Sequence, residues 1–333
     1  MDKIRITKIR LHSIRYRIRN VLYPLHILIH CYYFTAKSLQ FKLFYGSFQK
    51  EVDVILAYAR GEHLQNKEIA SGTLSCYKSL FDGGLDQVRY PFVYSGYLLQ
   101  KDNRNILVDT GVHQDNIIDG KAWANSPAEG GNQYVLDALA REGLTPDDIE
   151  IVMYTHLHND HAGGVLLFPN AQHLFQRDEY FNMLHPLPSQ KIRRDYDPRT
   201  PGDIAQIKNI RMIDGDFDFG NGIRIVKVPG HTLGGMAIQV QTAEGKYVIT
   251  GDMPHIAQSL FPQMNKMEVI GGKIVDITPA PENWGPFILN SVIYDHYACY
   301  DSFNKIMALA EAEDPKWFLT GHDMWCVNKK YFG

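Results

Sequence analysis

The chain has 333 residues, 45% of them hydrophobic and 21% charged, and its formal net charge at pH 7 is −3. So small a net charge argues against nucleic acid as the main partner, and the length alone allows about two domains. The cysteines are far apart and include no CxxC pair, so they predict reduced thiols of a cytoplasmic protein and not a disulfide framework. They are Cys31, Cys76, Cys299 and Cys326.

Residues 1–66 differ in composition from the rest of the chain. The first fifty contain ten Lys or Arg side chains and a single acidic one, Asp2, and residues 21–34 form a mostly apolar run. That run is shorter than the roughly 20 residues of a membrane-spanning helix, and no clear small-x-small site marks it as a signal peptide. We predict an N-terminal extension that packs against the body of the protein or a homodimer partner. Membrane-surface association and an exported location are the alternatives.

Side chains that bind metals follow four short apolar runs that predict β-strands. The runs occupy residues 151–154, 223–228, 247–249 and 317–319. An HxHxDH cluster at residues 156–161 follows the first run, and His231, Asp252 and His322 follow the other three. Loops that leave strand ends converge on one rim of a sheet, where they carry functional groups on a rigid base. Near the C-terminus, residues 302–313 have the apolar spacing of an outer helix.

The complete set has five imidazoles and two carboxylates, which is enough to hold two divalent ions. Its members are His156, His158, Asp160, His161, His231, Asp252 and His322. A single histidine is more often structural than a ligand, but chance is a poor explanation for the full cluster with three later partners at strand ends. Neutral imidazole nitrogen and carboxylate oxygen suit zinc, with iron, manganese or cobalt as alternatives. Two such ions polarise a carbonyl or phosphoryl group and generate hydroxide at neutral pH, so the set predicts a hydrolase.

These motifs resemble those of the metallo-β-lactamase superfamily and, within it, of the quorum-quenching N-acyl homoserine lactonases. The resemblance runs from about Lys67 to the C-terminus. Its further landmarks are segments 106–111, 143–148, 162–164 and 176–180. It implies an α/β (α+β) fold, a four-layer αβ/βα sandwich in which helices flank two mixed sheets. It also implies that residues 67–333 form the hydrolase domain and residues 1–66 an extension of it.

The resemblance divides the ligands between two metal ions. One ion would be held by His156, His158 and His231. The other would be held by Asp160, His161 and His322, and both by Asp252. Asp160 and Asp252 therefore count as catalytic residues as well as ligands. Zinc β-lactamases place Cys at the position of Asp252, which excludes them. Asp109 resembles the family's Asp that orients ligand histidines, and a turn residue at a strand end is its alternative role.

One position departs from the lactonase pattern. These lactonases carry a Tyr three residues after the bridging Asp, where this chain has His255. An imidazole there could donate a hydrogen bond or protonate the leaving oxygen, because its ordinary pKa lies near 6.5. A loop histidine that faces water is the alternative. We also expect residues 112–134 and the aromatic-rich segment 253–300 to shape a mostly apolar substrate cleft.

On these grounds the sequence predicts a dinuclear metal-dependent hydrolase that opens a small-molecule lactone. A metal-bridging hydroxide would attack the ester carbonyl, and the two ions would stabilise the carbonyl oxygen and the leaving alkoxide. Another carboxylic ester, a thioester, an amide or a phosphodiester is the alternative substrate for the same site. A non-catalytic scaffold is more remote, because structural metal sites are closed whereas this set leaves positions for water and substrate.

Overall fold

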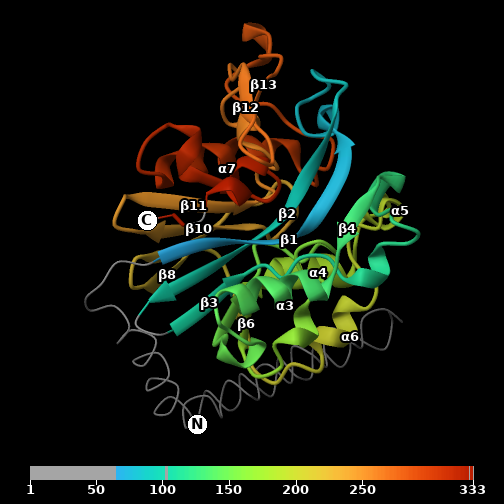
Figure 1. Ribbon diagram of the computed structural model, residues 1–333, viewed down its shortest axis with the longest axis vertical. Helices are drawn as coiled ribbons and strands as arrows, with labels where there is room; N and C mark the ends of the chain where they lie inside the picture. The colour runs from blue at the N-terminus through green and yellow to red at the C-terminus, as the bar shows by residue number, and fades with distance from the viewer. Residues whose placement is uncertain (1–64, 102–103, 330, 333) are drawn as a thin grey trace, which may run out of the picture. The chain divides into compact units, whose positions relative to one another are not determined.

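The computed structural model describes residues 65–101, 104–329, 331 and 332, and two β-sheets form its centre (Figure 1). Nearly all of the predicted N-terminal extension lies outside these residues. Within them, no helix combines the length and the apolar character that crossing a lipid bilayer requires. Cys76 and Cys299 are buried thiols outside any disulfide.

The first sheet has seven strands in the order β4-β1-β2-β3-β5-β6-β7. Their bounds are β1 Gln65–Tyr77, β2 Arg89–Lys101, β3 Arg104–Val108, β4 Ala128–Gly130, β5 Ile151–Met153, β6 Gln172–Gln176 and β7 Ile210–Ile213. The strands from β4 to β3 are antiparallel to their neighbours, whereas β3, β5, β6 and β7 run parallel. Parallel strands end at the same edge, so the loops after β3 and β5 leave the sheet side by side.

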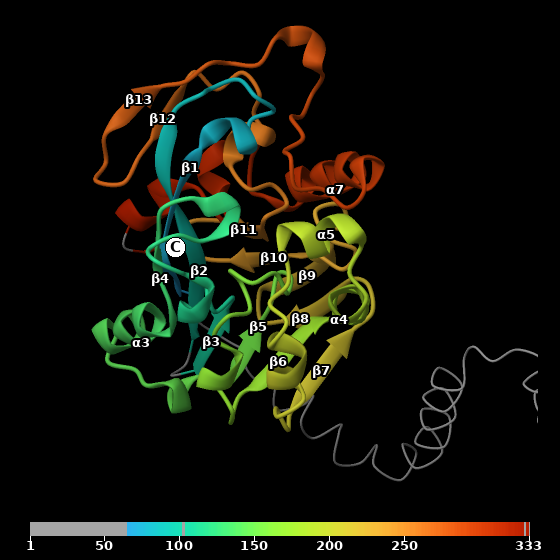
Figure 2. The same cartoon turned by 90° about the vertical axis from the view of Figure 1, so that its right-hand side faces the viewer.

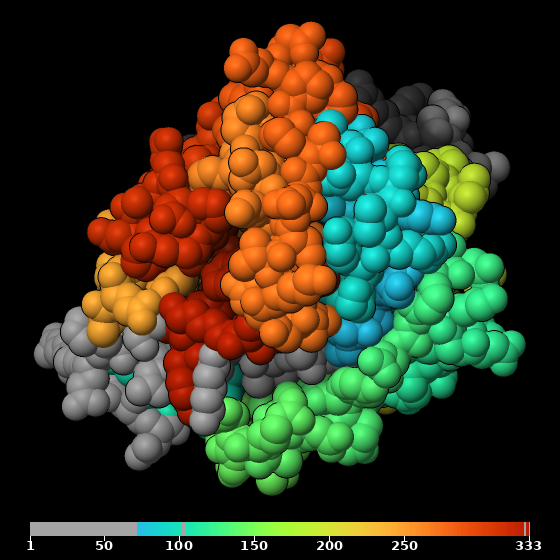
Figure 3. All heavy atoms as spheres, turned by 45° about the horizontal axis from the view of Figure 1, so that its top comes forward, coloured from blue at the N-terminus to red at the C-terminus, as the bar shows by residue number. Residues whose placement is uncertain are grey.

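The second sheet has five strands in the order β14-β11-β10-β9-β8. Their bounds are β8 Phe217–Gly220, β9 Ile223–Lys227, β10 Met236–Gln241, β11 Lys246–Gly251 and β14 Phe318–Thr320. Four of them form an antiparallel meander, and β14 adds to β11 in parallel. A separate hairpin, β12 Lys266–Glu268 and β13 Ile274–Asp276, lies in the segment after β11. In Figure 3 this orange segment lies between the blue-to-cyan β1–β2 region and the red C-terminal part.

Helices cover the outer faces of both sheets. Their bounds are α3 Asn132–Arg141, α4 Arg177–Leu184, α5 Pro188–Arg193, α6 Thr200–Ile204 and α7 His296–Leu309. Figures 1 and 2 show α3 and α4 beside strands of the first sheet and α7 beside β10 and β11 of the second. Two mixed sheets between two helical layers confirm the predicted four-layer αβ/βα sandwich.

The four predicted strands are confirmed as β5, β9, β11 and β14, each within two residues of the expected bounds. The C-terminal helix was misplaced: α7 begins at His296, six residues before the predicted start, and ends at Leu309. Its start is set by the Asp295 side chain, which accepts hydrogen bonds from the backbone N–H groups of Tyr297 and Ala298. A capping aspartate satisfies donors that the first helical turn leaves free, and the apolar spacing does not reveal it.

Candidate metal centre

The strands deliver the predicted ligands to one place between the sheets. The HxHxDH segment follows β5 of the first sheet, and His231, Asp252 and His322 follow β9, β11 and β14 of the second. Hydrogen bonds join the two sheets beside the site: Tyr97 Oη donates to Thr320 O at 2.8 Å, and Met236 N donates to Thr155 O at 2.8 Å. The site is therefore held by two rigid layers.

The seven side chains form two adjacent groups. One consists of His156, His158 and His231, and the other of Asp160, His161, Asp252 and His322; within each group the candidate ligand atoms lie within 4.8 Å of one another. Asp252 lies close to both groups: its Oδ1 is 3.2 Å from His161 Nε2, and its Oδ2 is 3.5 Å from His231 Nε2. The set thus has the composition and arrangement of a dinuclear metal centre with a central carboxylate.

Hydrogen bonds at Nδ1 fix the orientation of two of the candidate ligand histidines, His231 and His322. Nδ1 of His231 lies 2.7 Å from Val292 O, and Nδ1 of His322 lies 2.7 Å from Val93 O. A carbonyl only accepts, so both rings carry a proton on Nδ1 and, when neutral, turn the Nε2 lone pair inward. That arrangement is the one a metal ligand needs.

Buried polar atoms without partners give an independent test of the fit. His156 Nε2, His161 Nε2 and Asp252 Oδ1 are buried and make no hydrogen bond to the described residues. Unsatisfied buried polar atoms are costly, and several of them converging on one point indicate an ion-binding site. The donor set of imidazoles and carboxylates fits two divalent cations.

Burial and charge set the protonation of the centre. Burial holds the pKa of His156, His158 and His231 below the ordinary value, which keeps their lone pairs available. For His161 burial acts in the same direction, but carboxylates led by Asp252 outweigh it and raise the pKa. The carboxylates therefore demand positive charge in this place, which protons or metal cations supply.

Comparison with known proteins shows the family of the chain. The sequence model of the metallo-beta-lactamase superfamily matches residues 89–261. The chain belongs to the metallo-beta-lactamase superfamily.

Members of this superfamily with related sequences and folds are named as lactonases. The N-acyl homoserine lactonase AiiB of Agrobacterium fabrum is 37% identical over 189 residues, 53% of this chain and 68% of AiiB. The N-acyl homoserine lactonase of Bacillus thuringiensis is 29% identical over 171 residues, 49% of this chain and 64% of that relative, so the match spans less than two thirds of its length. The structure of an N-acyl homoserine lactone hydrolase with N-hexanoyl-L-homoserine bound at its catalytic metal centre superposes with a TM-score of 0.61 at 22% identity, covering 80% of this chain and 96% of that one. These matches agree with the fold and the family of the chain.

Two buried carboxylates that are not candidate ligands hold the surrounding segments in place through hydrogen bonds. Asp109, which follows β3 with φ 60°, accepts hydrogen bonds from Thr155 N at 2.8 Å and from His161 Nδ1 at 2.9 Å. It thereby fixes the His161 ring, the orienting role that the resemblance implied. Glu179 of α4 accepts hydrogen bonds from Leu157 N at 3.0 Å and Gly234 N at 3.1 Å, so it joins the loops that carry His158 and His231.

His255 faces the centre and not solvent, so it is not the water-facing histidine that was the alternative from sequence. It is 3% exposed, and its Nε2 lies 3.3 Å from Asp252 Oδ2. Asn290 contacts its other ring nitrogen: the Asn290 side-chain oxygen accepts from Val292 N at 2.9 Å, so its nitrogen donates to His255 Nδ1 at 2.6 Å. The ring of Phe81 stacks on His255 with centroids 4.9 Å apart. Sequence reasoning missed Asn290 and Phe81, which lie far from any motif and carry no local signal.

Two cavities adjoin at the centre. A small pocket of about 40 Å³ is lined by His255 and five of the seven candidate ligands, and a larger cavity of about 1050 Å³ opens beside it. Asn159 and Trp123 line both. Trp123 belongs to the predicted segment 112–134, so that part of the expectation agrees with the structure. The aromatic rings of segment 253–300 line neither cavity; Phe261 and Phe287 pack on Phe318 and Phe303, and Tyr297 is 87% exposed.

Proposed function

We propose that the chain is a dinuclear metal-dependent lactonase. The observation that carries the proposal is the set of seven buried or half-buried ligand-type side chains in two adjacent groups around Asp252. In this proposal His156, His158 and His231 hold one ion. Asp160, His161 and His322 hold the other, and Asp252 contacts both. The names of the relatives, AiiB at 37% identity among them, support a lactone as the substrate class.

The metal ions, once bound, would polarise the ester carbonyl and supply hydroxide at neutral pH. The chain's own groups complete the site. Asp109 keeps a proton on His161 Nδ1, which leaves Nε2 free to act as a ligand. His255 presents an Nε2–H toward the pocket, because its Nδ1 accepts from Asn290. A donor in that place stabilises negative charge on the carbonyl or leaving oxygen of an ester.

Metal analysis and one substitution test the centre. We expect about two transition-metal ions per purified chain. Asp252→Ala should lose at least one of them and reduce lactone turnover by about 1000-fold or more, because the carboxylate shared by both groups is removed. The exposed Asp276→Ala, on β13, is the matched control and should keep both metal and turnover. Full turnover in the Asp252 variant, or a metal-free wild-type protein indifferent to chelators, would refute the proposed centre.

A substrate panel tests the lactone assignment separately. Lactones should be hydrolysed with kcat/KM at least about tenfold above β-lactams and phosphodiesters, a margin of roughly 1.4 kcal/mol in transition-state stabilisation. Turnover of a thioester or phosphodiester without turnover of any lactone would leave the metal centre standing and show the lactone assignment to be wrong.

A further inference from the structure

A large cavity lies next to the metal centre. Its lining includes Asn159, which stands in the chain between the candidate ligands His158 and Asp160, and Trp123, which also lines the small pocket. A substrate with its ester at the centre therefore has this cavity as the adjoining space for the rest of its structure. At about 1050 Å³ the cavity is large enough for a substantial substituent.

The lining of the cavity carries an excess of positive charge. Its cations outnumber its carboxylates by five to three. The cations are Lys121, Lys191, Arg193, Arg194 and Arg199, and the carboxylates are Asp115, Asp119 and Asp197. Apolar surface still predominates in the cavity, as expected from the sequence, and these charged groups are set within it.

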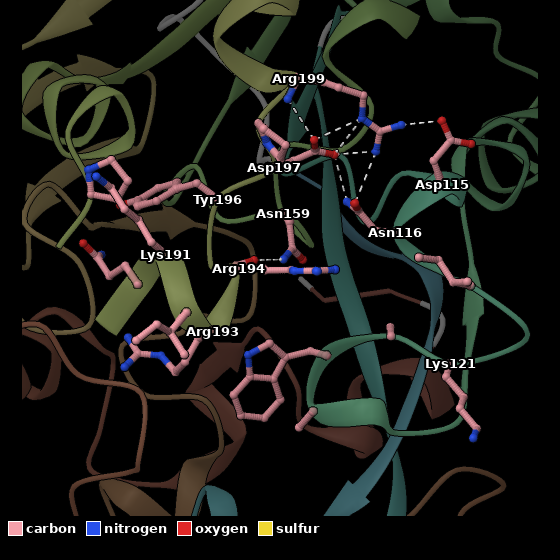
Figure 4. Close-up of a pocket in the computed structure, with 18 of the residues that line it drawn as sticks. Asp115, Asn116, Lys121, Asn159, Lys191, Arg193, Arg194, Tyr196, Asp197 and Arg199 are labelled. Atoms are coloured by element: carbon pink, nitrogen blue, oxygen red, sulfur yellow. Dashed lines mark hydrogen bonds and ion pairs between the residues drawn. The ribbon is translucent and has the colours of Figure 1, made fainter. Parts of the chain in front are cut away.

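Two of the cations are already paired. Arg199 forms ion pairs with Asp197 at 2.5 Å and with Asp115. Arg193 pairs with Asp195 at 2.6 Å. The bonds of Arg199 join two walls of the cavity, and Figure 4 shows them as the network between Arg199, Asp197, Asn116 and Asp115. For Arg194, Lys191 and Lys121, the described part of the chain places no carboxylate within ion-pairing distance.

Arg194 is the best placed of these three cations. It follows the last residue of α5 as its C-cap, in the left-handed region with φ 60°, and its carbonyl accepts a hydrogen bond from Asn159 Nδ2 at 2.6 Å. The backbone of Arg194 is thus tied to the segment that carries the metal ligands. In Figure 4 its side chain extends across the middle of the view, just below Asn159. The side chain of Arg194 therefore lies beside Asn159, one of the two residues that line both cavities.

We infer that the substrate carries an anionic group, remote from the bond that is hydrolysed, which Arg194 binds with help from Lys191. The planar guanidinium suits carboxylate, phosphate or sulfate oxygens, and Trp123 and Ile192 offer apolar surface to the chain that joins the anion to the ester. The part of this inference that concerns hydrolysis rests on the proposed lactonase function. The part that concerns anion binding does not.

Matched substrates test the inference in the metal-loaded enzyme. The set is an α-acylamino-γ-butyrolactone whose acyl chain ends in carboxamide, carboxylate or phosphate. We expect kcat/KM for at least one anionic member to exceed that of the carboxamide by about tenfold, and the advantage to shrink as salt is raised. Comparison of carboxylate with phosphate tells which anion the cavity favours. A carboxamide hydrolysed as well as both anions would overturn the inference.

Variants tie the preference to this cavity. Arg194→Met should reduce the ratio of anionic to neutral kcat/KM by about tenfold, and Lys191→Met by a smaller factor in the same direction. Lys208→Met removes an exposed lysine that does not line the cavity and should leave the ratio unchanged. Melting temperature and metal content confirm that each variant is folded. An unchanged ratio in both cavity variants contradicts the inference.

A binding measurement separates this inference from the proposed function. Hexane-1-sulfonate, a weak metal ligand, is titrated calorimetrically into the metal-loaded protein, with hexan-1-ol as the neutral control. We expect saturable binding of the sulfonate alone, lost in Arg194→Met. Arg194-dependent binding without any lactone turnover would sustain the anion site and refute the lactonase. Lactone turnover without sulfonate binding or charge preference would refute the anion site and sustain the lactonase.

Discussion

Asn290 determines which ring nitrogen of His255 carries the proton. Val292 N–H binds the Asn290 side-chain oxygen, so the amide cannot flip, and its nitrogen must donate to His255 Nδ1. The proton of the neutral ring is thereby placed on Nε2, next to Asp252 Oδ2. Val292 O also accepts from His231 Nδ1, so one peptide segment orients both rings.

We therefore expect His255→Ala to lower kcat by roughly 10–1000-fold while the protein keeps about two metals, the effect of one lost acid or electrostatic contact. Asn290→Leu keeps the volume but removes the donor, and should lower kcat by roughly tenfold. Nitrogen NMR of His255 should show a mixture of tautomers in that variant. Wild-type kcat in His255→Ala would make the residue a bystander, and lost metal would make it a ligand.

Asp323 gives a pH-dependent contribution to stability. It is buried, accepts hydrogen bonds from Ala257 N at 2.7 Å and Thr320 Oγ1 at 3.0 Å, and burial raises its pKa from 3.8 to about 6. The folded protein thus holds this proton more tightly than the unfolded chain. The resulting stabilisation is complete below pH 3.8 and is lost as pH rises through about 6, by about 3 kcal/mol at most.

Asp323→Asn keeps an acceptor oxygen and cannot ionise. Its free energy of unfolding relative to wild type should therefore rise between about pH 4 and pH 7 and stay level above that, as followed by urea denaturation of the metal-loaded proteins. The exposed Asp276→Asn should give a flat difference over the same range. A flat difference for Asp323→Asn too would show that this carboxyl is ionised throughout.

At the scale of single residues, the sequence predicts what local spacing encodes. The ligand candidates are recognisable because HxHxDH is contiguous and the other three follow apolar runs. His255 is found by its offset from Asp252. Asn290 lies 35 residues after His255, and its contact exists only because the chain folds back. No local pattern records such a contact.

At the scale of elements, strand ends assemble the centre. At Gly251, the end of β11 lies very close to the segment after β5. Gly251 is the last residue of β11, has φ 55°, and a Cβ there would lie 2.4 Å from Thr155 Oγ1 of the segment after β5. Thr155 Oγ1 donates to Asp109 Oδ2 at 2.7 Å. A side chain on Gly251 would thus disturb Asp109 and, through it, His161.

Gly251→Ala should lower the free energy of unfolding by about 2–4 kcal/mol, from backbone strain together with overpacking. Gly215→Ala is the matched control, because Gly215 also has positive φ, at 88°, but no atom lies within 4 Å of its added Cβ. Gly215→Ala should lower the free energy of unfolding only through backbone strain, by about 1 kcal/mol. Urea denaturation measures both, and equal losses would show that the contact with Thr155 is unimportant.

Strand positions were predictable because apolar runs of β-type residues record burial between layers. Of the large cavity, only the wall formed by residues 112–134 was expected from the sequence; the other wall comes from the region of α5 and α6, and ion pairs such as Arg199 with Asp115 bring the two walls together. Side chains 84 positions apart in the chain meet there. The composition of the α5 and α6 region alone suggests an ordinary charged surface.

At the scale of the whole molecule, the candidate ligands of the metal centre come from both β-sheets. The first sheet supplies Asp109 and the HxHxDH segment, and the second supplies His231, Asp252 and His322. Neither sheet holds a complete set, so metal binding requires the two sheets to pack. Residues 1–64, by contrast, contain none of the candidate ligands.

We therefore expect a protein that begins at Tyr58, the start of the compact unit that runs to Gly333, to keep about two metals per chain. A protein that begins at Lys78 lacks β1, which pairs with β2 along Gln65–Tyr77 and supplies Leu74 to the pocket; it should lose solubility or metal. Elemental analysis and light scattering of both proteins and the full chain measure metal content and oligomeric state. A change from dimer to monomer in the Tyr58 protein would assign the extension to subunit contact. A soluble Tyr58 protein without metal would instead show that residues 1–57 belong to the catalytic fold, because every ligand and its strand would still be present.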